Sequence, residues 1–187
     1  FISPINVAIP SGNFGNAYSA WFGRSNGLPV NKILCSTNVN DVLRRFIETG
    51  ELAPEKTLPS VAPSMDIQIP SSLERLIFDF TDGASAFYDA LLKEHKAKLS
   101  DDKIIQLNHI FSSSTFLDDD IKSEIKSLYE EFGSIFDPHS VTSIRMALNN
   151  QDSVPTVAVA TASPEKFSNV IAPLVETASE VVIDDKE

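Results

Sequence analysis

The sequence has one cysteine, no long apolar run and few basic residues, and each of these shortages excludes a kind of structure or partner. With Cys35 alone no internal disulfide can form, which is consistent with a reducing compartment, and we expect a cytoplasmic protein. No stretch approaches the ~18 consecutive apolar residues of a membrane-spanning helix, and no basic segment before an apolar one marks a secretory signal. The chain carries 15 Lys and Arg against 26 Asp and Glu, a net charge of −11. Such a surface repels phosphate backbones and anionic lipids, so neither nucleic acid nor a membrane is expected as a partner.

Helix and strand signals alternate along the chain, which indicates an α/β fold. Strands are predicted at 5–9, 32–36 and 156–160, and helices at 16–25, 41–49, 72–80, 84–98, 118–132, 139–148 and 164–174. The proline-containing segment 51–70 is interpreted as a long loop. Residues 101–117 are compatible with either a helix or a strand. The acidic tail VVIDDKE is expected to fray. The predicted architecture is a three-layer open sheet, mostly parallel, with helices on both faces.

The chain length fits one domain or a large part of one. The first residue is Phe1 rather than methionine, and the predicted strand 5–9 follows closely. A natural domain rarely opens with a buried strand so near its start. We therefore expect a fragment whose N-terminal part is absent.

The stretch IPSGNFGNAYSAW joins the first predicted strand to the first predicted helix. Gly12 and Gly15 lack Cβ atoms and let an anion approach the backbone, while the helix N-terminus presents free N–H groups. Asn13 and Asn16 add amide donors, with Asn16 a candidate helix cap, and Phe14 is expected to anchor the loop in the core. No Lys or Arg is present, which argues against a P-loop and suits a phosphate monoester held by backbone amides. The alternative is a plain strand–turn–helix connection, and the pattern alone favours neither.

Five segments resemble threonine synthase, a fold-type II pyridoxal phosphate enzyme of the tryptophan synthase β-like superfamily. PSGNFGN followed by GLPV is similar to the family's phosphate-binding segment. CSTNVNDVLRRFIETG, PSMDIQIPSSLERLIFD, FDPHS and ATASPEKF resemble later family segments in the same order. Together they span essentially the whole chain. The resemblance implies that residues 1–187 are the C-terminal part of the cofactor-binding catalytic domain, and that the N-terminal portion is absent.

The same resemblance implies a pyridoxal 5'-phosphate cofactor and assigns its contacts. The residues implied to hold the cofactor phosphate are Gly12, Asn13, Phe14, Gly15 and Asn16. Thr161 is implied to meet the pyridine nitrogen, where a hydroxyl permits a neutral nitrogen and a weaker electron sink than a carboxylate would. The alternative for Thr161 is a strand-end threonine that satisfies local backbone.

Substrate contacts are less defined. Ser71, Ser72 and Arg75 lie in a family-like segment, and Arg75 has the chemistry to clamp a phosphate bidentately. The alternative, which we favour for Arg75, is a solvated position on the following helix. His139 is expected to cap a helix or to lie near a domain contact. The three histidines do not have metal-ligand spacing, so no metal site is predicted.

The implied reaction is the conversion of O-phosphohomoserine and water to L-threonine and phosphate, a carbon–oxygen lyase step of threonine biosynthesis. The family's catalytic lysine lies in a Ser-Phe-Lys-Asp motif that does not occur here, so no catalytic residue is assigned and the chain alone is expected to be inactive. The alternatives are a threonine-synthase-like phospholyase, another fold-type II lyase, and a non-catalytic homologue that binds pyridoxal phosphate or another phosphorylated ligand. Ala62, Ser143 and Ser163 depart from the family pattern, and Ser143 puts close helix packing in doubt.

Overall fold

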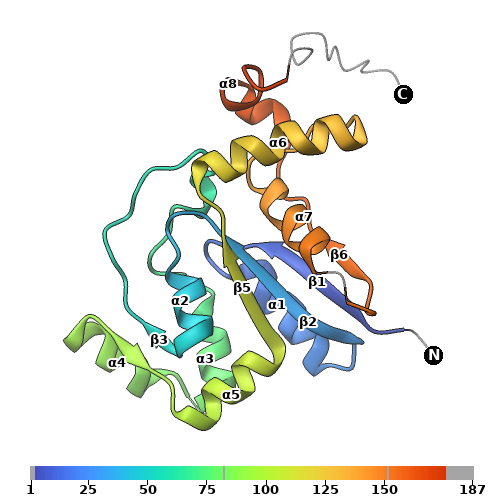
Figure 1. Cartoon of the computed structure of the whole chain (residues 1–187). Coiled ribbons are helices and arrows are strands. Elements are labelled where there is room, and N and C mark those ends of the chain that lie inside the picture. The colour runs from blue at the N-terminus through green and yellow to red at the C-terminus, as the bar shows by residue number, and fades with distance from the viewer. Residues whose placement is uncertain (1–2, 82, 151, 176–187) are drawn as a thin grey trace, which may run out of the picture.

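A four-stranded parallel sheet forms the centre of the molecule (Figure 1). The computed structural model describes residues 3–81, 83–150 and 152–175, so the predicted fraying of the tail lies outside the described residues. The strands are β1 (Ile5–Pro10), β2 (Val30–Thr37), β5 (Phe111–Thr115) and β6 (Thr156–Ala158), in the order β5-β2-β1-β6. Every neighbouring pair is parallel. The three strands predicted from apolar runs are therefore confirmed.

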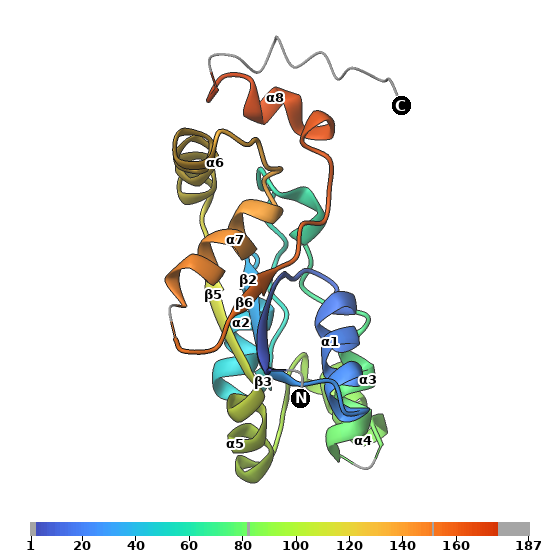
Figure 2. The same cartoon turned by 90° about the vertical axis from the view of Figure 1, so that its right-hand side faces the viewer.

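The sheet is covered by helices on both faces, as predicted (Figure 2). The helices are α1 (Gly15–Ser25), α2 (Val42–Thr49), α3 (Leu73–Thr81), α4 (Ser85–Glu94), α5 (Asp101–Ile110), α6 (Asp118–Phe132), α7 (Ser140–Asn149) and α8 (Ser168–Ile171). Because side chains alternate along a strand, Ile33 and Cys35 of β2 join a core with α1 to α5, while Leu34 between them joins a core with α6, α7 and α8. No helix in the described segments is long and apolar enough to cross a membrane.

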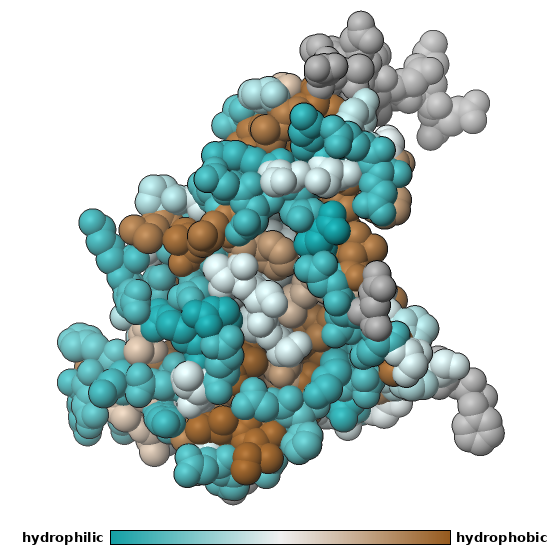
Figure 3. Space-filling view, viewed as in Figure 1, coloured by the Kyte–Doolittle hydropathy of each residue, from teal (hydrophilic) through white to brown (hydrophobic). Residues whose placement is uncertain are grey.

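The ambiguous segment 101–117 contains both a helix and a strand. α5 ends at Ile110, and β5 follows at once as an edge strand paired to β2. Its sequence, FSSST, carries one apolar side chain, and that residue, Phe111, is buried. Figure 3 shows the pale surface of β5 in the middle of one face. The strand exists because β2 supplies backbone partners, which no local pattern reveals.

Three other boundaries differ from prediction. The expected helix 84–98 ends earlier, because His95 adopts a left-handed conformation with φ 57°. Residues Ala97–Lys98 then form β4, which pairs antiparallel with β3 (Glu51–Leu52) inside the predicted loop. The predicted helix 164–174 is a 3₁₀ segment, Pro164–Phe167, followed by the short α8.

Cys35 lies within β2 and is completely buried, and burial raises the pKa of its thiol to about 12. At pH 8 only about one thiol in ten thousand is then ionised. We expect iodoacetamide to alkylate the native chain at least about 100-fold more slowly than the urea-unfolded chain, because the thiolate is the nucleophile. Mass spectrometry of timed samples measures both rates. Equal rates would show that Cys35 is accessible and contradict this packing.

Candidate functional site

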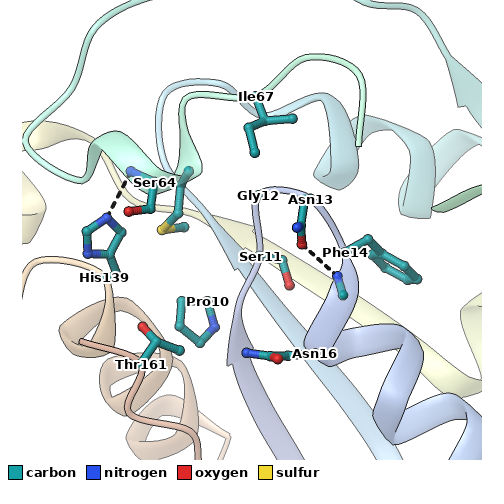
Figure 4. Close-up of a pocket in the computed structure, with 12 residues that line it drawn as sticks. Pro10, Ser11, Gly12, Asn13, Phe14, Asn16, Ser64, Ile67, His139 and Thr161 are labelled. Atoms are coloured by element: carbon teal, nitrogen blue, oxygen red, sulfur yellow. Dashed lines mark hydrogen bonds between the residues drawn. The ribbon is translucent and has the colours of Figure 1, made fainter. Parts of the chain in front are cut away.

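The strand order creates a crevice beside β1. The chain runs from β1 to β2 on one side, whereas β6 pairs with the other side of β1. Connections therefore leave the carboxyl ends of β1 and β6 in different directions, and in open α/β sheets ligands bind in such a crevice. A cavity of about 300 Å³ lies there. Its lining residues are Pro10, Ser11, Gly12, Asn13, Phe14, Gly15, Asn16, Ser64, Met65, Ile67, His139 and Thr161 (Figure 4).

The loop between β1 and α1 has an unusual backbone at Phe14. This residue has φ 71° and ψ 7°, a left-handed conformation that costs about 1–2 kcal/mol for a residue with a side chain. Its ring is buried and lies 5.6 Å from the ring of Phe111, centroid to centroid. A left-handed residue followed by a helical one turns successive N–H groups toward one side, which makes an anion-binding concavity. The predicted anchoring role of Phe14 in the core is confirmed.

Asn13 and Asn16 have different roles in the loop. The Asn13 Oδ1 atom accepts a hydrogen bond from the Gly15 N–H at 2.8 Å, which closes a local turn. The prediction that Asn16 caps the helix is wrong, because α1 begins at Gly15 and Phe14 occupies the cap position. Asn16 lies in the first helical turn and lines the cavity.

Gly12 is glycine because of a close approach by another segment. A Cβ atom at this position would lie 2.8 Å from the Ser64 carbonyl oxygen and 3.0 Å from the Met65 Cα. Both are backbone atoms of the 3₁₀ turn Pro63–Met65, which forms the opposite wall of the cavity. Any side chain at residue 12 would push this turn away from the loop.

The 3₁₀ turn is held in place by a polar network centred on Asp66. The Asp66 carboxylate accepts hydrogen bonds from Asn38 Nδ2 at 2.7 Å, Asn40 Nδ2 at 3.0 Å and Ser60 Oγ at 2.6 Å. Asn38 and Asn40 are buried and follow the carboxyl end of β2. The long loop is therefore fixed to the sheet directly beside the cavity.

A second network lies at the start of α7. The Asp137 Oδ1 atom accepts hydrogen bonds from the His139 backbone N–H at 2.9 Å and from His139 Nδ1 at 2.8 Å, and Oδ2 accepts one from the Ser140 hydroxyl. His139 Nε2 accepts the Ser64 N–H at 3.1 Å, and Ser140 Oγ accepts the Thr161 N–H at 2.9 Å. Burial alone would raise the pKa of Asp137, but the hydrogen bonds from His139 and Ser140 outweigh it and hold the pKa below its usual range.

We expect Asp137→Asn to destabilise the chain by about 2 kcal/mol at pH 7, since hydrogen bonds to a charged group contribute about 1.5–3 kcal/mol. The pKa of Asp137 is lower in the folded state than in the unfolded state. Its stabilisation is therefore complete above the unfolded pKa and is lost as the pH falls through the folded pKa. Urea unfolding between pH 8 and pH 2.5 should show a constant deficit down to pH ~4 that then shrinks.

Asp119→Asn is the control for Asp137→Asn, because the Asp119 side chain is fully exposed on α6. This variant should lose far less stability at every pH. A deficit of Asp137→Asn that stayed the same at pH 2.5 would mean that the carboxylate charge is not what stabilises this turn.

The predicted site residues divide into two groups. Gly12, Asn13, Phe14, Gly15, Asn16 and Thr161 all line the one cavity, although β1 and β6 bring them from opposite ends of the chain. Ser71, Ser72 and Arg75 do not line it. The Ser72 N–H donates to the Asn13 carbonyl at 3.0 Å, beside the loop. The Arg75 guanidinium lies over the Tyr18 ring, 5.6 Å from its centroid, as a residue on the outer face of α3.

The sequence did not predict that residues 63–67 form a wall of the cavity, nor that the His139 side chain contacts this wall. His139 occupies the cap position of α7, yet its side chain makes no cap bond there and reaches Ser64 instead. The turn Asp137-Pro138-His139 in the FDPHS segment was the one signal available in the sequence. Ser143 is fully buried, and its hydroxyl donates to the Val159 carbonyl at 2.9 Å, so this departure from the family pattern fits between α7 and the end of β6.

Charged groups are scarce at the cavity. Among the described residues no lysine or arginine lines it. Within the same segments, no cluster of three His, Cys, Asp or Glu residues could hold a metal ion. The arrangement suits an anion held by backbone N–H groups, and it provides no amine to form a covalent bond.

The chain is similar over most of its length to threonine synthases. It is 32% identical over 173 residues to the threonine synthase of Pseudomonas aeruginosa, an overlap of 89% of this chain and 37% of that protein. It is also 32% identical over 178 residues to threonine synthase-like 1 of Homo sapiens, covering 91% of this chain and 24% of that protein. The crystal structure of PLP bound threonine synthase from Brucella melitensis matches with a TM-score of 0.87 and 28% identity, over 91% of this chain and 38% of that one. No family model matches.

These comparisons confirm the resemblance to threonine synthase and the α/β fold class inferred from the motifs. The chain spans 37% or less of the length of the two relatives named.

Proposed function

We propose that this chain, a threonine synthase homologue, forms the part of a pyridoxal phosphate site that binds the cofactor phosphate and ring. The observation that carries the proposal is that six residues from two distant segments meet in one cavity. Its volume of about 300 Å³ is at the lower end for a small-molecule site. The left-handed backbone conformation of Phe14 and the absence of a side chain at Gly12 give the loop the concave backbone that a phosphate needs.

Each part of the cavity has a proposed task. The loop from Gly12 to Asn16 would hold the phosphate mainly through main-chain N–H groups, which need no lysine. The Gly15 N–H already donates to Asn13 Oδ1. Thr161 would offer its hydroxyl to the pyridine nitrogen, a partner that does not protonate it. When bound, the cofactor supplies a sink for electrons released as protons leave the substrate carbons. Ser71, Ser72 and Arg75 remain proposed substrate contacts, and Arg75 would have to leave its place over Tyr18 to reach the cavity.

For the whole protein we propose the conversion of O-phosphohomoserine and water to L-threonine and phosphate. Forming and breaking the covalent link to the cofactor needs a desolvated lysine. No lysine lines the cavity in the described segments, and the sequence has no Ser-Phe-Lys-Asp motif. The proposed reaction therefore needs a lysine that the described segments do not place at the cavity. The proposed activity of this chain alone is binding without turnover.

The test is a titration of the chain with pyridoxal 5'-phosphate and, as the matched control, with pyridoxal, which lacks only the phosphate. We expect the phosphate form to bind at least 10-fold more tightly, a difference of about 1.4 kcal/mol. The ³¹P NMR signal of the cofactor should shift on binding, and borohydride should trap no adduct at the cavity. Equal affinity for the two compounds would contradict a phosphate site.

A threonine-synthase-like phospholyase is the second candidate. The observation in its favour is the equal identity, 32%, to a threonine synthase and to threonine synthase-like 1. Both enzymes would remove phosphate from O-phosphohomoserine. A synthase adds water and releases threonine, whereas elimination followed by hydrolysis releases a keto acid and ammonia. Product analysis of the intact protein from its natural source separates the two.

A further inference from the structure

Three buried side chains at the start of α7 connect to two opposite walls of the cavity. Asp137, His139 and Ser140 are each at most 2% exposed. One wall is the segment after β6, which carries Thr161, and the other is the 3₁₀ turn Pro63–Met65 (Figure 4). These walls are about 100 residues apart in the sequence, so neither can position the other through local structure.

The first connection runs through Ser140 to Thr161. Thr161 lies beyond the end of β6 at Ala158 and belongs to no helix or strand. Its N–H donates to Ser140 Oγ at 2.9 Å. The Ser140 hydroxyl has one proton and donates it to Asp137 Oδ2, so a lone pair of its oxygen faces Thr161. The carboxylate thereby orients the hydroxyl that holds the Thr161 backbone.

The second connection runs through His139 to Ser64. The Ser64 N–H lies in the first turn of a 3₁₀ helix and has no partner within that helix. It donates to His139 Nε2 at 3.1 Å, so Nε2 is an acceptor and the ring proton is on Nδ1. Nδ1 is 2.8 Å from Asp137 Oδ1 and donates to it. The carboxylate thus selects the tautomer that accepts Ser64, and the ring is held further by an edge contact with Phe167 at 4.8 Å.

We propose that Asp137 is the positioning residue of the cavity, setting the Thr161 wall through Ser140 and the Ser64 wall through His139. The inference rests on the proposed function, because it is the cofactor ring that would need both walls at fixed positions. A binding site requires its contacts within about 0.5 Å of the productive geometry, and groups outside regular structure do not reach this without support. Asp137 itself does not line the cavity and touches no ligand there.

Two pairs of variants separate the two connections. Ser140→Ala removes the acceptor of Thr161, whereas the control Thr37→Val removes an equally buried hydroxyl on β2, whose hydrogen bonds go to Thr115 and Ser114 and not to either wall. His139→Asn keeps a donor for Asp137, but its shorter side chain places no acceptor at the former Nε2 position for Ser64. His139→Gln places an amide oxygen near the former Nε2 position and should restore the bond to Ser64.

Amide hydrogen exchange of the ¹⁵N-labelled chain measures each wall without any cofactor. Ser140→Ala should speed exchange of the Thr161 amide at least 10-fold and leave the Ser64 amide unchanged. His139→Asn should speed exchange of the Ser64 amide and leave the Thr161 amide unchanged. His139→Gln should return exchange of the Ser64 amide to the wild-type rate. Asp137→Asn should speed exchange of both amides, and Thr37→Val should speed neither. A role in overall stability alone would speed all amides together in every destabilised variant.

Cofactor titration completes the test. Ser140→Ala should weaken pyridoxal 5'-phosphate binding about 10-fold and change the absorption of the bound ring, while the ³¹P shift stays as in the wild type. If the wild-type chain does not bind the cofactor but the amides respond as described, the proposed function fails and the two connections stand. If Ser140→Ala leaves the Thr161 amide unchanged, or if Thr37→Val speeds that amide as much, the positioning role of Asp137 is wrong.

Discussion

Phe14→Ala should destabilise the chain by about 3–5 kcal/mol, the usual cost of removing a buried phenylalanine ring. The Phe14 ring is 1% exposed and packs on Phe111 of the edge strand β5. Losing it leaves a hole under the loop and removes the contact that anchors the loop to the sheet. Urea unfolding should show a lower midpoint with an unchanged slope. Cofactor binding should be lost with the loop geometry, even at temperatures where the variant stays folded.

Phe14→Gly is the matched comparison that isolates the backbone conformation. It removes the same ring, but glycine adopts the left-handed conformation of residue 14 without steric cost. We expect Phe14→Gly to be about 1 kcal/mol more stable than Phe14→Ala, because the relief of strain exceeds the extra chain entropy of glycine. If alanine proved the more stable of the two, the left-handed backbone at residue 14 would be contradicted.

Gly12→Ala should weaken binding of pyridoxal 5'-phosphate at least 100-fold, or about 2.7 kcal/mol. The new Cβ would lie 2.8 Å from the Ser64 carbonyl oxygen and 3.0 Å from the Met65 Cα. Neither backbone atom can rotate away as a side chain would, so the loop and the 3₁₀ turn must separate. Overpacking of this kind also costs about 1–3 kcal/mol of stability. Isothermal titration calorimetry and urea unfolding measure the two effects.

Gly23→Ala is the control for Gly12→Ala. A Cβ at residue 23 would also approach an atom at 2.8 Å, but that atom is the tip of the exposed Leu28 side chain, which can move. Residue 23 lies inside α1, where alanine is favoured over glycine by up to about 1 kcal/mol. Binding should be unchanged and stability equal or higher. Equal losses of binding in both variants would show that the close approach of the turn to Gly12 is not what matters.

The sequence-based predictions were most accurate where the residues that signal an element lie within a few positions of it. α6 was predicted with correct ends, because an apolar stripe, acidic residues at its start and Gly133 at its end all act within a few residues. β5 was left undecided within residues 101–117, because FSSST has no strand pattern and depends on pairing with β2. The end of α4 was missed, since His95 adopts a conformation more typical of glycine.

The features of the candidate site also divide into those that neighbouring residues signal and those that depend on long-range contacts. The sequence alone placed a glycine-containing loop without basic residues between the first strand and the first helix, and the resemblance to a family pointed to a phosphate there and to Thr161. These features are carried by contiguous residue types with their own conformational preferences. Only the tertiary structure decided that the turn Pro63–Met65 closes over Gly12, that His139 reaches Ser64, and that Asp137 connects both walls. Such contacts join residues many positions apart, and they exist only after the sheet has set the distance between its loops.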